Sequence, residues 1–164
     1  MRNGHKFLII YLVSTIIFLI FHWMYQGWDF SVYVLNAQYW FDGGSYFEIE
    51  RAPLMSLLIT AFSFLGWKAA EYFYIIFASA LFLYSSISIA KAFRFDAAHY
   101  YLISLNAFIL VYGLIEGTEL LSLALLQLFL AALLRDKLWS GVFLALACLS
   151  RYTLVIFFPL LLLH

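Results

Sequence analysis

The sequence predicts an all-α membrane protein, a polytopic helix bundle with one large extracytoplasmic loop that contains short interfacial helices. Of the 164 residues, 66% are hydrophobic and 11% are charged, and the mean hydropathy is +0.98. A soluble domain of this size needs more polar surface. The charges also gather in short stretches between long apolar runs. We expect one transmembrane module over residues 1–164, with five or six membrane helices and an outer loop over about residues 25–70.

The first membrane helix is predicted over residues 7–24. No Asp, Glu, Lys or Arg lies between Lys6 and Asp29. At 1.5 Å per residue, this run is long enough to cross about 30 Å of hydrocarbon. The bulky residues that follow, from His22 to Tyr25, offer no small-residue cleavage site. We therefore interpret the run as a retained signal anchor and not as a cleaved signal peptide.

The outer loop begins with the most polar stretch of the chain, over residues 29–54. Residues 30–41 predict a short helix with aromatic residues all round it, and Asp42 precedes Gly43 and Gly44 in a predicted turn. The stretch also contains Glu48, Glu50 and Arg51. A polar loop between long apolar segments is where chemistry at a membrane surface would lie.

A short apolar helix over residues 53–67 follows and is predicted to end at Gly66. It is too short to span a bilayer, so we expect it to lie half-inserted or along the interface. Further membrane helices are predicted over residues 72–90, 97–115 and 120–134. Residues 138–163 are interrupted by Arg151 and Pro159, which leaves open one kinked helix or two short helices that meet near Arg151.

The charge distribution selects the topology. Cytoplasmic loops of membrane proteins carry an excess of Lys and Arg. If the N-terminus is cytoplasmic and residues 53–67 do not cross, six of the nine basic residues are inside: Arg2, Lys6, Lys91, Arg94, Arg135 and Lys137. Seven of the nine acidic residues are then outside: Asp29, Asp42, Glu48, Glu50, Glu71, Glu116 and Glu119. We expect a multi-pass protein of the plasma membrane whose active face is extracytoplasmic.

This topology brings two acidic groups, residues 29–50 and 116–119, to the same face. Gathered carboxylates of this kind can position a sugar, bind a divalent metal or supply a general base. Asp29 is either a helix N-cap or a site residue, and Glu116 and Glu119 either complement a helix N-terminus near Thr118 or belong to the site. The aromatic residues of the loop either stack on a sugar or anchor the interface.

Two arginines are candidates for holding an anion. Arg51 either pairs with Glu48 or Glu50 or binds a phosphate through its guanidinium fork. Arg151 lies within an apolar segment, where an unpaired charge costs at least about 2.5 kcal/mol. It therefore snorkels to the outer interface, pairs with an outer acid or binds an anionic ligand.

Other site classes find less support in the composition. The formal net charge is zero, so nothing indicates nucleic acid as a partner. The single cysteine, Cys148, excludes an internal disulfide and a cysteine-based metal site. The histidines have no shared spacing and are interpreted as packed or interfacial residues. No cofactor is firmly predicted, and a divalent metal bound by the outer carboxylates stays open.

The order of these features resembles the N-terminal module of GT-C-type membrane glycosyltransferases, in particular the protein-mannosyltransferase and aminoarabinose-transferase-like group of archaea and bacteria. The resemblance covers the whole chain. It consists of WDFSVYVLNA after the first span, a Gly-Gly-x-Tyr-Phe-Glu turn, Arg-x-Pro before the short helix, GTELLSLALL and finally GVFLALACLSRYT. Each motif alone is weak, and their shared order is more specific.

The resemblance implies transfer of a sugar, with inversion, from a polyprenyl (dolichyl or undecaprenyl) phosphate carrier to an acceptor on the outer side. It implies that Asp29 is the general base and that Glu116 or Glu119 is a second acidic site residue. Arg51 and Arg151 would hold the carrier phosphate, and Glu48 would contact the substrate. The expected partners are the lipid-linked donor and membrane lipid.

Two departures limit the resemblance. Ala52 stands where an Arg-Pro-Pro feature would have its first proline. Such enzymes also continue for several more spans, whereas this sequence ends at LLLLH. We therefore expect a truncated chain, a natural half-length relative or a subunit that needs a partner. The alternative function is a non-catalytic module that binds the lipid carrier or acts in assembly.

Overall fold

The computed structural model describes residues 2–113, 117–135 and 138–162, and every regular element within these ranges is helical. The all-α prediction is therefore confirmed for the described residues. In chain order the elements are α1 (Arg2–Met24), α2 (Trp28–Asp42), α3 (Leu54–Phe62), the 3₁₀ helix η1 (Ser63–Leu65), α4 (Trp67–Phe93), α5 (Ala97–Ser104), α6 (Ala107–Tyr112), α7 (Glu119–Leu133), α8 (Trp139–Ser150), the 3₁₀ helix η2 (Tyr152–Phe157) and α9 (Phe158–Leu162).

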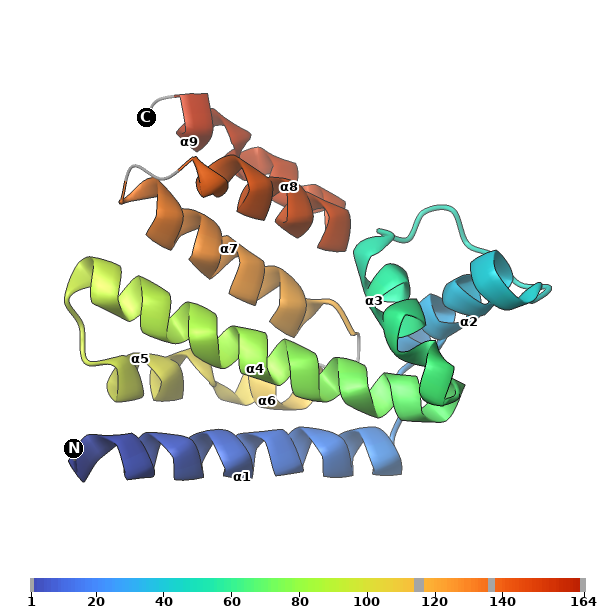
Figure 1. The fold of residues 1–164 in the computed structure, drawn as a ribbon, viewed down its shortest axis with the longest axis horizontal. Coiled ribbons are helices and arrows are strands. Elements are labelled where there is room, and N and C mark those ends of the chain that lie inside the picture. Colours follow the sequence, from blue (N-terminus) through green and yellow to red (C-terminus); the bar gives the residue numbers. More distant parts are fainter. Residues whose placement is uncertain (1, 114–116, 136–137, 163–164) are drawn as a thin grey trace.

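The long helices form a bundle around α4, which packs against α1, α3, α5 and α7, and α7 packs in turn against α8 (Figure 1). The short helices α2 and α3 lie together beyond one end of the bundle, where α1 ends and α4 begins (Figure 1). The chain does not return along the bundle between α1 and α4. This arrangement agrees with the expectation that residues 53–67 stay at one end.

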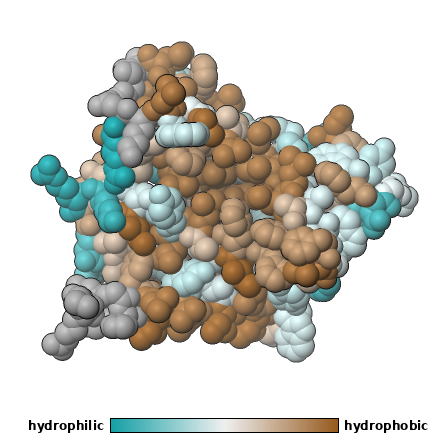
Figure 2. All heavy atoms as spheres, in the orientation of Figure 1, coloured by the Kyte–Doolittle hydropathy of each residue, from teal (hydrophilic) through white to brown (hydrophobic). Residues whose placement is uncertain are grey.

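Two helices among the described residues, Phe7–Met24 and Trp67–Phe93, are long and apolar enough to cross a membrane. α1 also exposes apolar side chains along most of its length, which suits contact with lipid. Figure 2 shows that apolar residues cover the middle of this face of the molecule, between polar residues at its two ends. These observations indicate association with a membrane. The larger number of five or six membrane helices stays a prediction.

Small residues let α4 and α7 approach closely. Ala78 and Ala90 of α4 and Ala124 and Ala131 of α7 are buried, as is typical of helix interfaces in membranes. The buried amide of Gln127 adds a polar contact, because its Oε1 accepts from the Ser85 hydroxyl at 2.7 Å. These contacts hold the middle of α7 against α4.

The structure corrects or decides three helix predictions. The helix predicted over residues 97–115 is wrong as one element, because α5 ends at Ser104 and the Asn106 side chain caps a separate α6 by accepting from the Ile109 N–H at 3.1 Å. Of the predicted segment 138–163, the described residues 138–162 form two helical segments that meet at Arg151, whose backbone is extended. The helix predicted over residues 72–90 is longer, since it begins directly after Gly66.

Candidate functional site

One end of the bundle collects the segments that the sequence predicts to carry the site. α1 and α8 end there, α4 and α7 begin there, and α2 and α3 lie there (Figure 1). The opposite end carries the last turn of α4 and the start of α5. Residues that lie far apart in the sequence are therefore close to one another at the α2–α3 end.

Asp29 and Arg51 form the first ion pair at this end. Arg51 Nη2 donates to Asp29 Oδ1 at 2.7 Å. Its Nε lies 3.3 Å from Glu48 Oε1, which is close enough for an ion pair but lacks hydrogen-bond geometry. Asp29 is not the helix N-cap, because Gly27 occupies that position and α2 begins at Trp28. The carboxylate lies instead in the first turn of α2, where it complements the helix dipole.

The surroundings of Arg51 keep it charged. Burial acts to lower the pKa of its guanidinium, but the hydrogen bond and negative charge of Asp29, together with the charge of Glu48, raise that pKa above its usual value. Arg51 therefore acts as a fixed cation between two carboxylates at any physiological pH.

The Asn36 side chain fixes the loop that carries Glu48. Asn36 Nδ2 donates to the Glu48 carbonyl oxygen, and the Glu48 N–H donates to Asn36 Oδ1, both at 2.9 Å. The Asn36 side chain is buried, so these bonds face little competition from water. α2 thus positions both carboxylate partners of Arg51, one directly and one through the Asn36 amide.

Glu119 and Arg151 form the second ion pair. α8 ends at Ser150, and the extended backbone of Arg151, with φ −157° and ψ 108°, turns its side chain toward the start of α7. Arg151 Nη1 donates to Glu119 Oε1. The Glu119 side chain is 8% exposed and that of Arg151 is 45% exposed. Of the alternatives for Arg151, the structure shows pairing with an acid, Glu119.

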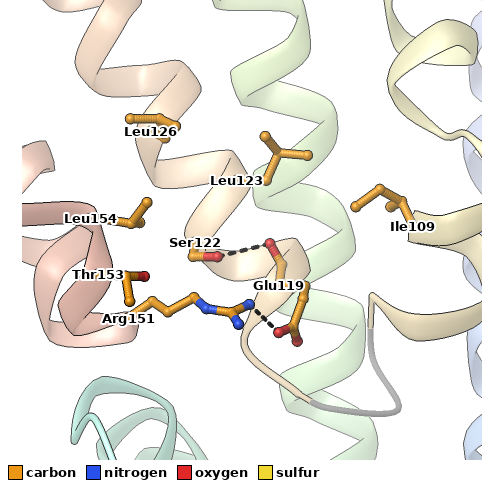
Figure 3. A pocket seen from close by; sticks show the side chains of 8 residues that line it. All are labelled: Ile109, Glu119, Ser122, Leu123, Leu126, Arg151, Thr153 and Leu154. Carbon is orange, nitrogen blue, oxygen red and sulfur yellow. Dashed lines mark hydrogen bonds and ion pairs between the residues drawn. The ribbon is translucent and has the colours of Figure 1, made fainter. Parts of the chain in front are cut away.

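A pocket with a volume of about 270 Å³ lies beside this second pair. Figure 3 shows Arg151 extending toward Glu119, with apolar side chains around the remaining wall. The lining residues are Ile109, Glu119, Ser122, Leu123, Leu126, Arg151, Thr153 and Leu154. The pocket therefore combines an apolar wall with a partly exposed guanidinium.

Tyr33 lies beside the first ion pair. It is buried, and the Arg51 guanidinium carbon is 5.9 Å from the centre of its ring. Burial raises the pKa of the Tyr33 hydroxyl, while a hydrogen bond with Thr118 acts to lower it, and the charges of Arg51, Asp29 and Glu119 also reach it. Tyr33 therefore stays neutral at physiological pH, and its ring faces Arg51.

The structure therefore brings five of the predicted site residues to one end of the bundle, as two ion-paired groups: Asp29, Glu48, Arg51, Glu119 and Arg151. Glu116 lies outside the described residues. Thr118 occupies the N-cap position of α7 without a capping bond from its side chain. Within the described ranges, no three His, Cys, Asp or Glu side chains gather closely enough to hold a metal ion.

Sequence reasoning missed a further polar cluster at this end, in which His22 and Glu71 are buried and Lys68 is exposed. His22 Nε2 lies 2.8 Å from Glu71 Oε2, and Lys68 Nζ donates to the same oxygen at 2.8 Å. The cluster joins the end of α1 to the start of α4. His22 and Glu71 both lie near the predicted outer ends of two membrane helices. Their common position at one interface could have indicated that they pair. Tyr33 gave no such signal, because its neighbours come from distant segments.

Comparison with known proteins returns nothing. No protein-family profile, no curated protein and no solved structure matches this chain. The interpretation of the site therefore depends on its own residues and geometry.

Proposed function

We propose that this protein is a membrane glycosyltransferase module that transfers a sugar from a polyprenyl-phosphate-linked donor to an acceptor at the extracytoplasmic face. The observation that carries the proposal is the meeting of two arginine–carboxylate pairs at one end of the bundle, beside an apolar pocket. Such an arrangement suits a ligand that joins a polar, anionic headgroup to a hydrocarbon chain.

Asp29 is the proposed general base. Its side chain is 35% exposed, so an acceptor hydroxyl can reach the carboxylate. Asp29 takes the hydroxyl proton as the acceptor oxygen attacks the anomeric carbon of the sugar. The new glycosidic bond forms while the bond from the anomeric carbon to the phosphate oxygen breaks, and the electron pair leaves with the carrier phosphate. Attack on the face opposite the phosphate inverts the anomeric configuration.

Arg151 is the proposed contact for the carrier phosphate. It is the more exposed of the two paired arginines and lines the pocket. A phosphate at the pocket mouth can accept from the guanidinium N–H groups that point away from Glu119. The apolar wall formed by Leu123, Leu126 and Leu154 then takes the first isoprene units. A fixed cation beside the leaving phosphate stabilises the charge that develops on it.

The proposed topology follows from the two polar ends. Exposed basic residues lie at the end opposite the site, where α4 carries Lys91 in its last turn and Arg135 follows α7. Acidic residues predominate at the α2–α3 end. By the positive-inside rule, this distribution supports a cytoplasmic N-terminus and a site outside the plasma membrane. Membrane lipid surrounds the bundle in this arrangement.

The proposal is tested by assaying sugar transfer from a polyprenyl-phosphate-linked donor in vesicles that contain the full chain. Replacing Asp29 by Asn removes the base and is expected to reduce the rate by about a hundredfold or more. Asp42→Asn is the matched control, because Asp42 lies at the same end and accepts from Trp67 Nε1 at 3.0 Å, which an amide can also do. A wild-type rate in Asp29→Asn would remove Asp29 from the mechanism. Repeating the assay with EDTA decides whether a divalent metal is required.

The pocket also supports a second candidate function, a non-catalytic module that binds the lipid carrier or serves a partner subunit. Arg151 and the pocket need no contribution from Asp29 to hold a carrier. This function predicts saturable binding of polyprenyl phosphate without turnover. Binding should weaken in Arg151→Gln and not in Arg135→Gln, whose guanidinium donates to the Ser88 carbonyl elsewhere. Equal binding by both variants would contradict it.

A further inference from the structure

Exposed aromatic side chains gather at the end of α2 and in the loop after it, which project away from the bundle (Figure 1). We call four of them the aromatic platform: Tyr39, Trp40, Tyr46 and Phe47. The Phe47 ring stacks on the Tyr39 ring, with the ring centres 4.9 Å apart and an interplanar angle of 22°, and lies 5.7 Å from the Trp40 ring. The four residues are 37% to 45% exposed, so a ligand can reach each of them.

The backbone holds the aromatic platform in place. Gly43 ends α2 with φ 72°, a left-handed conformation that reverses the chain and brings Phe47 back onto the helix. The two hydrogen bonds between the Asn36 side chain and the Glu48 backbone, both 2.9 Å long, close the loop. A ligand that binds to the aromatic platform therefore has little loop to order, which lowers the entropic cost of binding.

Glu48 connects the aromatic platform to Asp29. The Tyr46 hydroxyl donates to Glu48 Oε2 at 3.4 Å, and Glu48 Oε1 lies 3.3 Å from Arg51 Nε. Arg51 Nη2 in turn donates to Asp29 Oδ1 at 2.7 Å. One guanidinium therefore separates the carboxylate beside the aromatic platform from the proposed general base. A ligand that covers the platform is close enough to present a hydroxyl to Asp29.

The charges and rings of residues 39–50 favour one class of ligand. The segment contains three acidic residues and no Lys or Arg, which opposes contact with an anionic membrane surface. If the segment entered hydrocarbon, Glu48 and Glu50 would also have to leave water at a high cost. A sugar ring suits both features, because its C–H face packs on aromatic rings and its hydroxyl groups donate to carboxylates.

We propose that the aromatic platform is the acceptor subsite and that the acceptor is a saccharide. Its ring stacks on the platform, and one of its hydroxyl groups gives its proton to Asp29. The oxygen of that hydroxyl forms the new glycosidic bond, and the carrier phosphate leaves with the electron pair of the bond that breaks. The attacking oxygen therefore belongs to a sugar and not to a protein side chain. The acceptor role rests on the proposed function, whereas saccharide binding does not depend on it.

Saccharide binding is tested by saturation-transfer NMR on the full chain in phosphatidylcholine nanodiscs, which contain no sugar that could compete. The probes are the methyl glycosides of mannobiose, cellobiose and lactose. Trp40→Leu removes a ring and is expected to weaken binding about three- to tenfold, whereas Trp40→Phe keeps a ring and should bind within about twofold of the wild type. The same loss is expected for Tyr46→Leu, so the test does not depend on one variant.

Trp139→Leu is the matched control for the ring substitutions. Trp139 is 65% exposed and begins α8 at the opposite end of the bundle (Figure 1), so its loss should leave disaccharide binding unchanged. The inference is overturned if none of the three disaccharides binds. It is also overturned if Trp40→Leu and Tyr46→Leu bind as the wild type does, or no more weakly than Trp139→Leu.

Two other occupants of the aromatic platform give different results. A serine- and threonine-rich peptide that binds in a Trp40-dependent manner, while no disaccharide binds, would assign the platform to a protein acceptor. The difference in fluorescence between the wild type and Trp40→Phe isolates the Trp40 signal. Quenching of that signal by lipids brominated on their acyl chains would place the platform in the membrane. Either result overturns the inference.

The acceptor role is tested by sugar transfer with the bound disaccharide as the acceptor. Trp40→Leu should raise the KM for the disaccharide about three- to tenfold and leave kcat within about twofold, because the platform binds the ring and Asp29 accepts the proton. An unchanged KM overturns the acceptor role. Disaccharide binding without any transfer supports the saccharide subsite and contradicts the proposed function. Transfer to another acceptor without disaccharide binding supports the proposed function and contradicts this inference.

Discussion

The two ion pairs at the α2–α3 end differ in how firmly their members are held. Arg51 lies between two carboxylates, Asp29 and Glu48, and its side chain is only 23% exposed. Arg151 contacts one carboxylate, Glu119, and its side chain is 45% exposed at a pocket. In the first pair the cation is enclosed and an acid is accessible. In the second the acid is buried and the cation is accessible.

This difference assigns different tasks to the two pairs. An accessible carboxylate beside a fixed cation is suited to accept a proton, and an accessible guanidinium anchored on a buried carboxylate is suited to bind an anion. For both tasks to act on one ligand, the distance between the Asp29 carboxylate and the Arg151 guanidinium must stay constant. We therefore expect changes that loosen either pair to affect stability and ligand binding in different proportions.

The largest effect is expected at the second pair. Arg151→Gln should reduce the free energy of unfolding by about 2 to 3 kcal/mol, because it leaves the buried Glu119 carboxylate without this cation. The cost is not larger, because about half of the arginine side chain is already exposed to solvent. Chemical unfolding in micelles measures this. The double variant Glu119→Gln/Arg151→Gln should be more stable than Arg151→Gln alone. If the double variant is less stable than Arg151→Gln, the buried Glu119 carboxylate is not stabilised by Arg151.

The next largest effect is expected for Asn36→Ala, which should disturb the first pair and not the second. Asn36→Ala removes two partly buried hydrogen bonds to the Glu48 backbone and should cost about 2 kcal/mol of unfolding free energy. Because the Glu119–Arg151 pair does not use this loop, affinity for undecaprenyl phosphate should fall less than in Arg151→Gln. Measuring both quantities on the same preparations checks the prediction. A loss of binding equal to that of Arg151→Gln would show that the pairs do not act separately.

Two glycines with positive φ, Gly117 before α7 and Gly43 after α2, allow a test of the segment that carries Glu119. Gly117 has φ +97°, and a Cβ there would lie 2.6 Å from Met55 Cε. Gly43 has φ +72° and open space around the same position. Both alanine variants should lose about 1 kcal/mol through the left-handed backbone. Only Gly117→Ala should also weaken undecaprenyl phosphate binding, since it moves the segment that carries Glu119. Equal binding by the two variants would argue against that dependence.

The smallest effect is a pH dependence at Tyr33. Burial raises the pKa of this hydroxyl above the usual tyrosine value of about 10. Above that pH the unfolded chain loses the proton more readily than the folded protein, so stability falls as the pH rises. Tyr33→Phe should make this decline shallower. Unfolding curves between about pH 9 and pH 11 test it, and parallel curves for the two proteins would contradict the burial of the hydroxyl.

Local sequence signals predicted most of the helices. Charge-free runs gave α1 and α4, and Pro53 and Gly66 bounded the short helix that became α3 and η1. The break between α5 and α6 was missed because the surrounding residues are apolar. At the break the Asn106 side chain starts α6 by accepting from the Ile109 N–H. A single asparagine in an apolar run is a weak signal by itself.

The site was predictable to the extent that charge and topology determine it. An arginine within an apolar segment must find a partner, and the positive-inside rule placed Glu119 at the same end. Arg51 was predicted to pair with Glu48 or Glu50 or to bind a phosphate. The structure pairs it with Glu48 and also with Asp29, which was not predicted as its partner. The contacts of Tyr33 and of His22 with Glu71 depend on tertiary packing, which periodicity does not encode.

The proposed function requires that the α2–α3 end faces the outside of the cell. The most direct test labels single cysteines with a membrane-impermeant maleimide on intact cells, in a Cys148→Ser background. Lys68→Cys, directly after Trp67, and Glu50→Cys should react from outside, whereas Lys91→Cys at the opposite end should react only after permeabilisation. Labelling of Lys91→Cys in intact cells, with protection of Lys68→Cys and Glu50→Cys, would contradict the account.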